Sequence, residues 1–484
     1  MPNGPFTRKL ANLSRVAARD INELQEALEN TPTLAESGGA AIARVDPGVV
    51  GANDEVLAWR SGGPVWLRTQ GVLNVENHGV RTTNTAAQNA IALNDLFTSI
   101  RSGAEPSRRV FFPSLYSVDT TILVNQSDLE LFGVTRERSG LTSTTANIPV
   151  LRWNDEKNGE RNIHVHDLWL GNSTNPTALT TQQYGIQFRA TVDGTGGLIY
   201  GYHNCAFTDL WFSKQYIGIG EYSTGTGKVV IWATEFRRIV GQDIKYGLIR
   251  LVSSTSAGQP RLVISDIDVL NYGAVRNDPG GGYAIEVSAA NGLSLRDVNI
   301  EKWKGTAIYI VGGAGGHLSN LRIEWQDHSL ATDTVVTLVD GHFTVDNAVI
   351  SFESIGGGGP QSIFYIVGAN DSARISGVSA STIDPTPTGT MELIRAPAGV
   401  KVELSGFSNQ IPSVLSEYLP VGWGEPGSYA RTSVNGSPPA IDVLPTASAT
   451  YRGRMFRVEG GAGVADVTYI CRKDAANAYG WVAI

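Results

Sequence analysis

The sequence repeats a short unit in which an acidic residue or Asn precedes a run of alternating apolar and polar residues. Seven copies align, and the residues that start them are Asp167, Asp209, Glu235, Asp266, Asp297, Asn320 and Asn347. The starts are 42, 26, 31, 31, 23 and 27 residues apart. Such uneven spacing is typical of a solenoid whose coils carry loops of different length, and not of a propeller with uniform blades. We therefore expect an all-β chain wound as a parallel β-helix.

Alternation within each unit predicts which side chains face the core. The inward residues are expected to be Leu168, Leu210, Phe236, Ile267, Val298 and Leu321. We interpret the recurrent Asp and Asn residues as turn residues and not as a calcium ladder, because both side chains bond local backbone and tolerate left-handed conformations.

Composition narrows the possible functions of the 484-residue chain. Its net charge of −8, with Lys and Arg spread singly, leaves no basic stripe for nucleic acid. Cys205 and Cys471 are too few and too far apart for a disulfide framework or a zinc site. No apolar run at the N-terminus resembles a signal peptide. We expect no cofactor, no nucleic-acid partner, and synthesis in a cytoplasm with another route to the outside.

Changes in composition and residue pattern along the chain divide it into four segments. Residues 1–32 contain a predicted helix, Leu10–Asn30, whose apolar side is too short to hold a coiled coil alone. Residues 33–71 are rich in Gly, Ala, Pro and Val and are expected to form a linker or small shaft. Residues 72–420 are assigned to the β-helix. Residues 421–484 are expected to form a small β module with two or three strands that covers the open end of the solenoid.

The beginning of the third segment carries a resemblance. A strand is followed by NHGV, by TAAQNAI as a helix with Asn84 as its N-cap, by VFFP, and by SLYSV. We expect Ala87, Ile91, Leu93, Phe97 and Ile100 on the packed side of that helix. This order, over residues 73–142, resembles the start of the pectate-lyase-like right-handed parallel β-helices of phage tailspikes, polysaccharide depolymerases and polygalacturonase relatives. The acidic G-A-x-G-D-G loop usual there is replaced by residues 78–84, so the resemblance implies the fold more than the chemistry.

Stacked coils place equivalent outward residues in ladders about 4.8 Å apart. The alignment predicts one ladder of Trp169, Trp211, Arg237, Asp268, Asn299 and Arg322. A second ladder, two residues along, holds Leu270, Glu301, Glu324 and Ser351. Aromatic rings, carboxylates, Arg and Asn are the groups that bind sugars, so this face is the predicted polysaccharide site.

Glycoside hydrolysis needs two carboxyl groups, about 5 to 5.5 Å apart in retaining enzymes and about 6.5 to 9.5 Å apart in inverting ones. Strand geometry puts Asp268 and Glu301 at roughly 8 Å, which predicts inversion, with Glu301 as acid and Asp268 as base on water. Glu324, expected one coil from Glu301, is a possible substitute for either. Stacked carboxylates can equally be solvated or paired with neighbours such as Arg322 and Lys302, and Trp169 and Trp211 can be buried between subunits.

The favoured function is therefore recognition and endoglycosidic cleavage of bacterial surface polysaccharide. The resemblance implies a homotrimeric virion appendage, assembled in the host cytoplasm, attached to phage tail or virion adaptor proteins through the N-terminus, and acting at the host cell surface. Three alternatives stay open: a receptor-binding spike without catalysis, a structural appendage, and a polysaccharide lyase.

Overall fold

The computed structural model describes the chain from residue 55 onwards, with gaps. The described residues are 55–60, 63–68, 71–105, 107–154, 160–176, 182–190, 199–223, 228–252, 259–270, 282–288, 290–326, 334–352, 361–368, 371–382, 391–396, 400–405, 408–409, 415–416, 440–441, 444, 446–448, 452, 455–458, 460, 464–476 and 478–484. The predicted helix at Leu10–Asn30 lies outside them.

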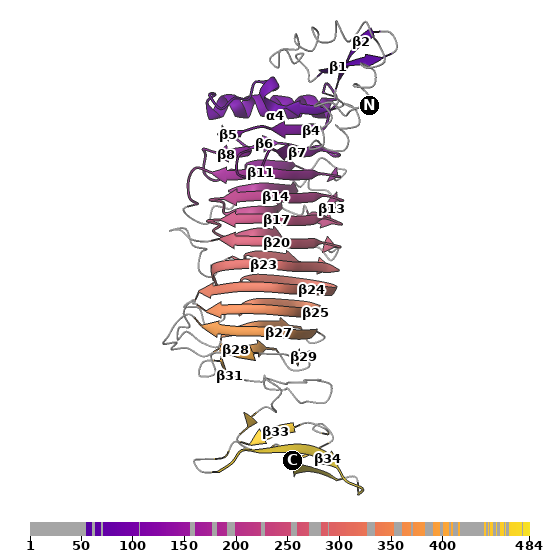
Figure 1. Cartoon of the computed structure of the whole chain (residues 1–484), viewed down its shortest axis with the longest axis vertical. Coiled ribbons are helices and arrows are strands. Elements are labelled where there is room, and N and C mark those ends of the chain that lie inside the picture. The colour runs from indigo at the N-terminus through magenta and orange to yellow at the C-terminus, as the bar shows by residue number, and fades with distance from the viewer. Residues whose placement is uncertain are drawn as a thin grey trace, which may run out of the picture.

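Parallel strands from successive coils form a column that runs the length of the solenoid (Figure 1). We call it the first stack. Its strands are β7 (Glu130–Gly133) with β8 (Gly140–Ser143), β11 (His164–Asn172), β14 (Ala206–Ser213), β17 (Glu235–Gln242), β20 (Val263–Leu270), β23 (Leu293–Lys304), the later part of β24 (Ile308–Gln326) and of β25 (Thr334–Phe352), β27 (Ser372–Thr382) and β29 (Lys401–Ser405). This arrangement confirms the predicted right-handed parallel β-helix.

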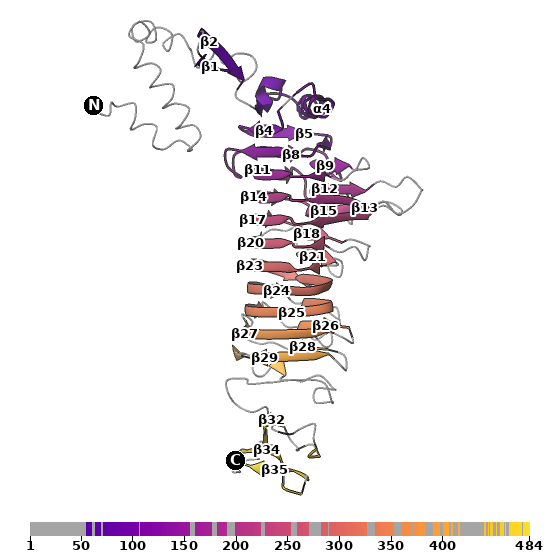
Figure 2. The ribbon, with the colours of Figure 1, turned by 90° about the vertical axis from the view of Figure 1, so that its right-hand side faces the viewer.

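A second stack lies behind the first and is visible after a quarter turn (Figure 2). Its strands are β9 (Leu151–Asn154), β12 (Tyr184–Ala190), β15 (Ile217–Ser223), β18 (Gly247–Leu251), β21 (Ile285–Ser288), the early part of β24 and of β25, β26 (Gln361–Val367), β28 (Met391–Arg395) and β31 (Leu415–Ser416). Shorter strands complete the middle coils: β10 (Glu160–Arg161), β13 (Ile199–His203), β16 (Lys228–Trp232), β19 (Gln259–Pro260) and β22 (Ala290–Asn291).

The core is a set of apolar ladders inside the coils. All six residues predicted to point inward, from Leu168 to Leu321, are at most 1% exposed. Phe207 and Phe236 lie in adjacent coils and stack with ring centroids 5.3 Å apart. Since equivalent positions in each coil bury similar side chains, the repeat in the sequence becomes one continuous core.

The first-stack strands from β11 to β27 each pass through a residue in the left-handed region. The φ angles of Asp167, Asp209, Asp266, Asp297, Asn320 and Asn347 lie between 54° and 58°. Arg238 and Gly377 hold the same place in their coils, at φ 52° and 64°. The recurrent Asp and Asn residues therefore take the left-handed conformation that the sequence indicates, but at bends within strands and not in separate turns. We call this line of residues the corner ladder.

The N-terminal end of the solenoid is covered by a helix. The covering segment comprises β3 (Val72–Asn74), the short 3-10 helix η1 (Val75–His78) and α4 (Ala86–Ser102). The next coil, whose β4 pairs with β3, comprises β4 (Arg109–Phe112), β5 (Leu115–Val118) and β6 (Ile122–Leu123). The N-cap of α4 is Thr85 and not Asn84, because Thr85 and Gln88 form a reciprocal capping box. Helix α4 lies across the end of the strands (Figure 1), so their edges are not open to pairing.

The packed side of α4 differs from the predicted one. Leu93, Phe97 and Ile100 are buried as expected, but Ile91 is 62% exposed and Ala87 is also exposed. The predicted set mixed two sides of the helix, and Ala90 and Leu96 complete the side that covers the coils.

Two smaller sheets lie beyond the coils. β1 (Glu55–Arg60) and β2 (Gly63–Arg68) pair antiparallel within the segment where a linker was expected. At the other end, β32 (Ala440–Ile441), β33 (Met455–Val458), β34 (Val467–Lys473) and β35 (Tyr479–Ala483) form one sheet below the last coil (Figures 1 and 2), with β30 (Ser408–Asn409) next to β27 above it. Among the described residues, no helix is long and apolar enough to cross a membrane.

Candidate functional site

Two carboxylates of the first stack share one amide donor. Asp268 on β20 and Asn299 on β23 are register partners in adjacent coils. Asn299 Nδ2 donates to Asp268 Oδ1 and to Glu301 Oε1, at 3.2 Å in each case. The two oxygens therefore lie no more than twice 3.2 Å, about 6.4 Å, apart. This separation is smaller than the roughly 8 Å expected from strand geometry, because both side chains turn towards one nitrogen.

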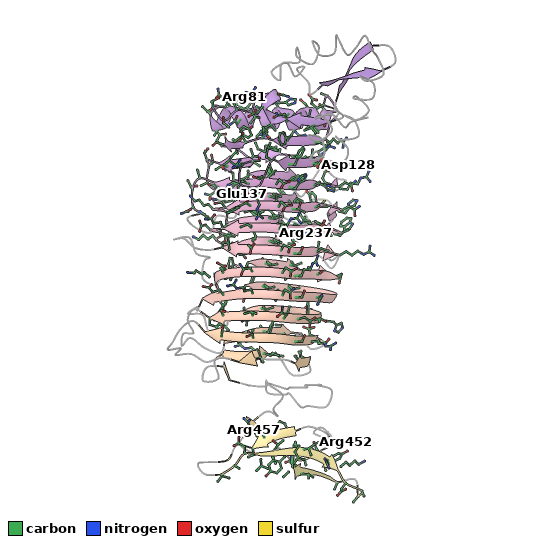
Figure 3. All side chains as sticks on the ribbon, viewed as in Figure 1. Arg81, Asp128, Glu137, Arg237, Arg452 and Arg457 are labelled. Carbon is green, nitrogen blue, oxygen red and sulfur yellow. The ribbon has the colours of Figure 1, made fainter. Side chains whose placement is uncertain are left out.

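Asp268 also lines a pocket of about 300 Å³. Part of its wall is the corner ladder, because successive coils place their corner residues side by side. The rest comes from the loop between β7 and β8, in which Figure 3 labels Glu137. The lining residues are Thr135, Arg136, Glu137, Asp167, Asp209, Arg238, Asp266 and Asp268. Five carboxylates against two guanidinium groups make the pocket acidic.

Arg238 and Asp209 form a bidentate ion pair in the pocket wall. Arg238 donates from Nε to Asp209 Oδ1 at 2.6 Å and from Nη2 to Asp209 Oδ2 at 2.5 Å. These hydrogen bonds hold the pKa of Asp209 below its usual value, against the opposing effect of burial. Arg136 donates to the main-chain oxygen of Arg238 at 3.1 Å. The β7–β8 loop is thus tied to the corner ladder three coils further along the first stack.

Two other acids of the pocket have cationic or imidazole partners. Arg237 donates from Nε to Asp266 Oδ2 at 3.2 Å. The ring of His166 bridges Asp167 and Glu130, with nitrogen to oxygen distances of 2.8 and 3.1 Å.

Asp268 differs from these acids, because its hydrogen bond comes from the neutral amide of Asn299. Among the pocket carboxylates it is therefore the one placed to act on a bound molecule without first leaving a charged partner.

The two predicted tryptophans are adjacent, as the alignment indicates. Trp169 and Trp211 are register partners, and their rings stack with centroids 5.1 Å apart. Trp169 folds over its own strand, since a Cβ added to Gly171 would lie 2.4 Å from the Trp169 Nε1. The Arg136 guanidinium lies over the Trp211 ring, 5.9 Å from its centroid. Both indoles are half-buried. They lie next to the pocket residue Arg136, and part of each ring surface is covered by contacts within the protein.

Arg237 does not belong to the predicted ladder. Its register partners are Thr208 and Ser265, while the place beside Trp211 and Asp268 is held by Val240. The alignment of this coil was wrong by three residues, because Phe236 and Ile239 both point inward and either fits the apolar position. The left-handed residue in this coil is Arg238, so the usual Asp or Asn marker is missing.

The predicted pairing of Glu301 with Glu324 is interrupted. The strands are in register at Ile300 with Ile323 and resume at Trp303 with Trp325, so β23 holds one extra residue between these points. Lys302, with φ of 54°, forms this bulge. Arg322 lies in the predicted ladder beside Asn299 and is exposed.

Sequence reasoning missed the contribution of the β7–β8 loop. Arg136 and Glu137 lie outside every repeat, and Arg136 is hydrogen bonded to Arg238, which is 102 positions away in the chain. No local pattern signals such a contact. Arg238 gave no signal either, because it replaces the Asp or Asn that marks this position in most other coils. Within the described part of the chain, no group of three or more His, Cys, Asp or Glu could hold a metal ion.

The architecture places the chain in the class of right-handed parallel β-helix proteins. No family model and no curated protein matches the sequence. Among solved structures, the gp42 tailspike of Acinetobacter phage vb_AbaP_AS12 is 10% identical, with 87% of this chain and 83% of that chain covered and a TM-score of 0.51. The likeness confirms the fold that the residue pattern at 73–142 predicts, and at this identity it concerns the fold alone.

Two further solved structures are more distant. The full-length tailspike protein 2 from an Escherichia coli O157:H7 bacteriophage is 13% identical, covers 67% of this chain and 45% of its own, and has a TM-score of 0.33. The N-terminal fragment of bacteriophage Phi29 gene product 12 is 12% identical, covers 71% of each chain, and has a TM-score of 0.36.

Proposed function

We propose that the protein is a phage tailspike that binds a bacterial surface polysaccharide on the first stack and hydrolyses it there. The observation that carries the proposal is the shared hydrogen bonding of Asp268 and Glu301 to Asn299, beside an acidic pocket. Two carboxyl groups within reach of one bond are what glycoside hydrolysis needs. Glu301 protonates the leaving oxygen and Asp268 acts on the sugar or on water.

The distance between the carboxylate oxygens of Asp268 and Glu301 bears on whether hydrolysis retains or inverts the anomeric configuration. The upper limit of about 6.4 Å on the distance from Asp268 Oδ1 to Glu301 Oε1 includes the separation usual for retaining enzymes and lies just below that for inverting ones. Asp268 can therefore attack the sugar carbon directly or activate water, and the anomeric form of the first product, followed by NMR, separates these two routes. Glu324 is a weaker candidate for either role because the bulge at Lys302 takes it out of register with Glu301.

Substrate binding is assigned to the residues around this pair. Asn299 positions both carboxylates, Arg322 lies beside it on the next coil, and Trp169 with Trp211 borders the pocket. Arg237 acts through Asp266, to which it is hydrogen bonded, and so shapes the pocket wall.

The test is reducing-end release from purified bacterial surface polysaccharides. Glu301→Gln is expected to lower turnover by about 10² to 10⁴, the usual contribution of a general acid. Asp297→Asn, an exposed acid on the same strand, is the matched control and should leave turnover unchanged. Equal activity of wild type and Glu301→Gln would refute the assignment. Products with an unsaturated sugar, seen by ultraviolet absorbance, would identify a lyase instead.

A receptor-binding spike without catalysis is the second candidate. It is favoured by the ion pairs in the pocket, since Asp209 and Asp266 already have arginine partners. Retention of polysaccharide by the wild-type protein without release of reducing ends would support it. A purely structural appendage would show neither retention nor release.

We also propose a homotrimer joined to phage tail or virion adaptor proteins through residues 1–32, with the β-helix at 72–420 meeting the host surface and residues 421–484 closing its far end. Sedimentation equilibrium at three times the chain mass of 51.7 kDa is the expected result. A monomer at all concentrations would contradict this assembly.

A further inference from the structure

Two arginines lie close together on the second stack, on the neighbouring strands β9 and β12 (Figure 2). Arg152 of β9 and Gln187 of β12 are register partners in adjacent coils, and Arg189 lies two residues beyond Gln187 on the same strand. The residues before and after each arginine belong to the core, so both arginines point outward. Strand geometry puts their Cα atoms roughly 8 Å apart, and side chains of this length can reach one small ligand between them.

Arg152 is held in place by a neutral group. Its Nε donates to Gln187 Oε1 at 2.8 Å. This hydrogen bond fixes the orientation of the amide, because the reversed amide would set two donors against each other. Within the described part of the chain, the two Nη atoms of Arg152 have no hydrogen-bond partner. The edge of the guanidinium that binds a carboxylate is therefore available.

Arg189 is also held by a neutral group, the ring of its register partner Tyr222. The guanidinium carbon lies 6.0 Å from the ring centroid, so stacking covers one face and leaves the N–H edge uncovered. The Nε of Arg189 is buried without a hydrogen-bond partner, and so is the Nε2 of Gln187, a residue that is 0% exposed. Because a buried donor without an acceptor costs free energy, a ligand that brings acceptor oxygens would stabilise this cluster.

The positive charge of this cluster is not compensated by the described residues. None of their carboxylates forms an ion pair with Arg152 or Arg189. Glu221, the one acid in the sequences of β9, β12 and β15, lies on the core side of its strand. Burial lowers the pKa of Arg152, and the nearby charge of Arg189 adds to this shift. By contrast, Arg250 in the same ladder donates from Nε to Glu286 Oε2 at 2.8 Å.

The surroundings favour a small anion over a protein partner. Two half-buried cations without an anion are unfavourable, and a carboxylate matches the planar fork of a guanidinium. Interfaces between proteins usually contain an apolar centre. The described residues of β9, β12 and β15 include no large exposed apolar side chain. The cluster is therefore suited to a carboxylate carried by a polar molecule.

We propose that Arg152, Gln187 and Arg189 form a carboxylate-binding site for an acidic sugar of the bacterial surface polysaccharide. The two guanidinium groups bind the carboxylate, and Gln187 positions Arg152. The site lies on the second stack and Asp268 on the first, so it holds the polymer and does not cut it. This inference rests on the proposed function and deepens it, because it names the substrate class as a polysaccharide with carboxylated sugars.

The experiment uses the full chain carrying Glu301→Gln. The probes are carboxylated bacterial surface polysaccharides and the same polysaccharides after reduction of their carboxylates to alcohols. Binding to a carboxylated polysaccharide is expected, and reduction should weaken it about tenfold or more, as loss of a charged hydrogen bond does. Adding Arg152→Gln or Arg189→Gln should weaken binding of the carboxylated form to a similar extent and leave that of the reduced form unchanged.

Two further variants control this measurement. Arg472→Gln, an exposed arginine on the C-terminal sheet, is the matched control and should change nothing. Arg189→Lys keeps the charge but loses the planar fork, so it guards against a folding defect and should weaken binding less than Arg189→Gln.

Absence of binding to every carboxylated polysaccharide, equal binding after reduction, or equal binding by the two glutamine variants would overturn the inference. So would a fall in oligomer mass on Arg189→Gln, which would identify the cluster as part of an interface between copies of the chain. Turnover by wild type together with equal binding by the glutamine variants would refute the carboxylate site alone. Carboxylate-dependent binding that is lost with Arg189→Gln, but without turnover by wild type, would refute hydrolysis alone.

Discussion

The contact of Asn299 with two carboxylates can be tested without knowing the substrate, by Asn299→Asp. The change replaces a shared donor with a third carboxylate close to Asp268 and Glu301. Two unit charges at 4 Å interact with about 1 kcal/mol in water and about 4 kcal/mol at an effective dielectric of 20. Because Asn299 is half-buried, the two new repulsions should together destabilise the fold at pH 7 by roughly 2 to 4 kcal/mol.

The dependence of the stability of Asn299→Asp on pH and on calcium tests whether charge repulsion causes the destabilisation. A proton on one of three clustered carboxyl groups relieves the repulsion, so the loss of stability should be full at pH 7 and shrink as the pH falls. Calcium, which takes several carboxylate ligands, should restore the melting temperature of Asn299→Asp at pH 7 and leave wild type unchanged. Asn299→Leu, which removes the donor without adding charge, should show neither dependence. If Asn299→Asp melts like Asn299→Leu at every pH and calcium concentration, the three side chains are not clustered.

Three further predictions concern the fold around the site. Asn320→Val should lower the unfolding free energy by about 1 to 2 kcal/mol relative to Asn320→Gly, because a β-branched residue resists the left-handed region, and equal melting of the two would contradict the corner geometry. Gly140→Ala should destabilise strongly in thermal melts, since its Cβ would lie 2.0 Å from a main-chain oxygen of the next coil, whereas Gly480→Ala, with no atom within 4 Å, should not. Asp209→Asn should cost roughly 0.5 kcal/mol at pH 7, as expected for a partly exposed ion pair. Because the pKa of Asp209 is lowered in the folded state, that cost should fade below about pH 4, and a cost independent of pH would show that the ion pair with Arg238 is not its origin.

The repeat in the sequence was sufficient to predict the winding and the direction of the core side chains. Leu168 and Val298 could be placed because alternation in a strand has only two outcomes, and apolar residues take the inner one. The register between neighbouring coils was harder to predict from the sequence. In the coil of Phe236, an inward residue also lies three positions later, at Ile239, and a corner formed by Arg238 removed the marker that aligned the other coils.

The candidate site could be predicted only in part from the sequence. Asp268 and Asn299 were placed side by side because their coils align without insertion. The bulge at Lys302 is a local backbone choice that the repeat does not encode, so the register between Glu301 and Glu324 could not be predicted from the sequence. Contacts made across several coils, such as those of Arg136, depend on how a loop folds back over the solenoid.

A crystal structure of Glu301→Gln soaked with an oligosaccharide from a polysaccharide that the wild type cleaves is the most direct measurement. We expect a sugar ring between Asp268 and residue 301, with the polysaccharide chain extending into the pocket beside Asp209. A sugar bound productively on any other surface, with this pair untouched, would contradict it.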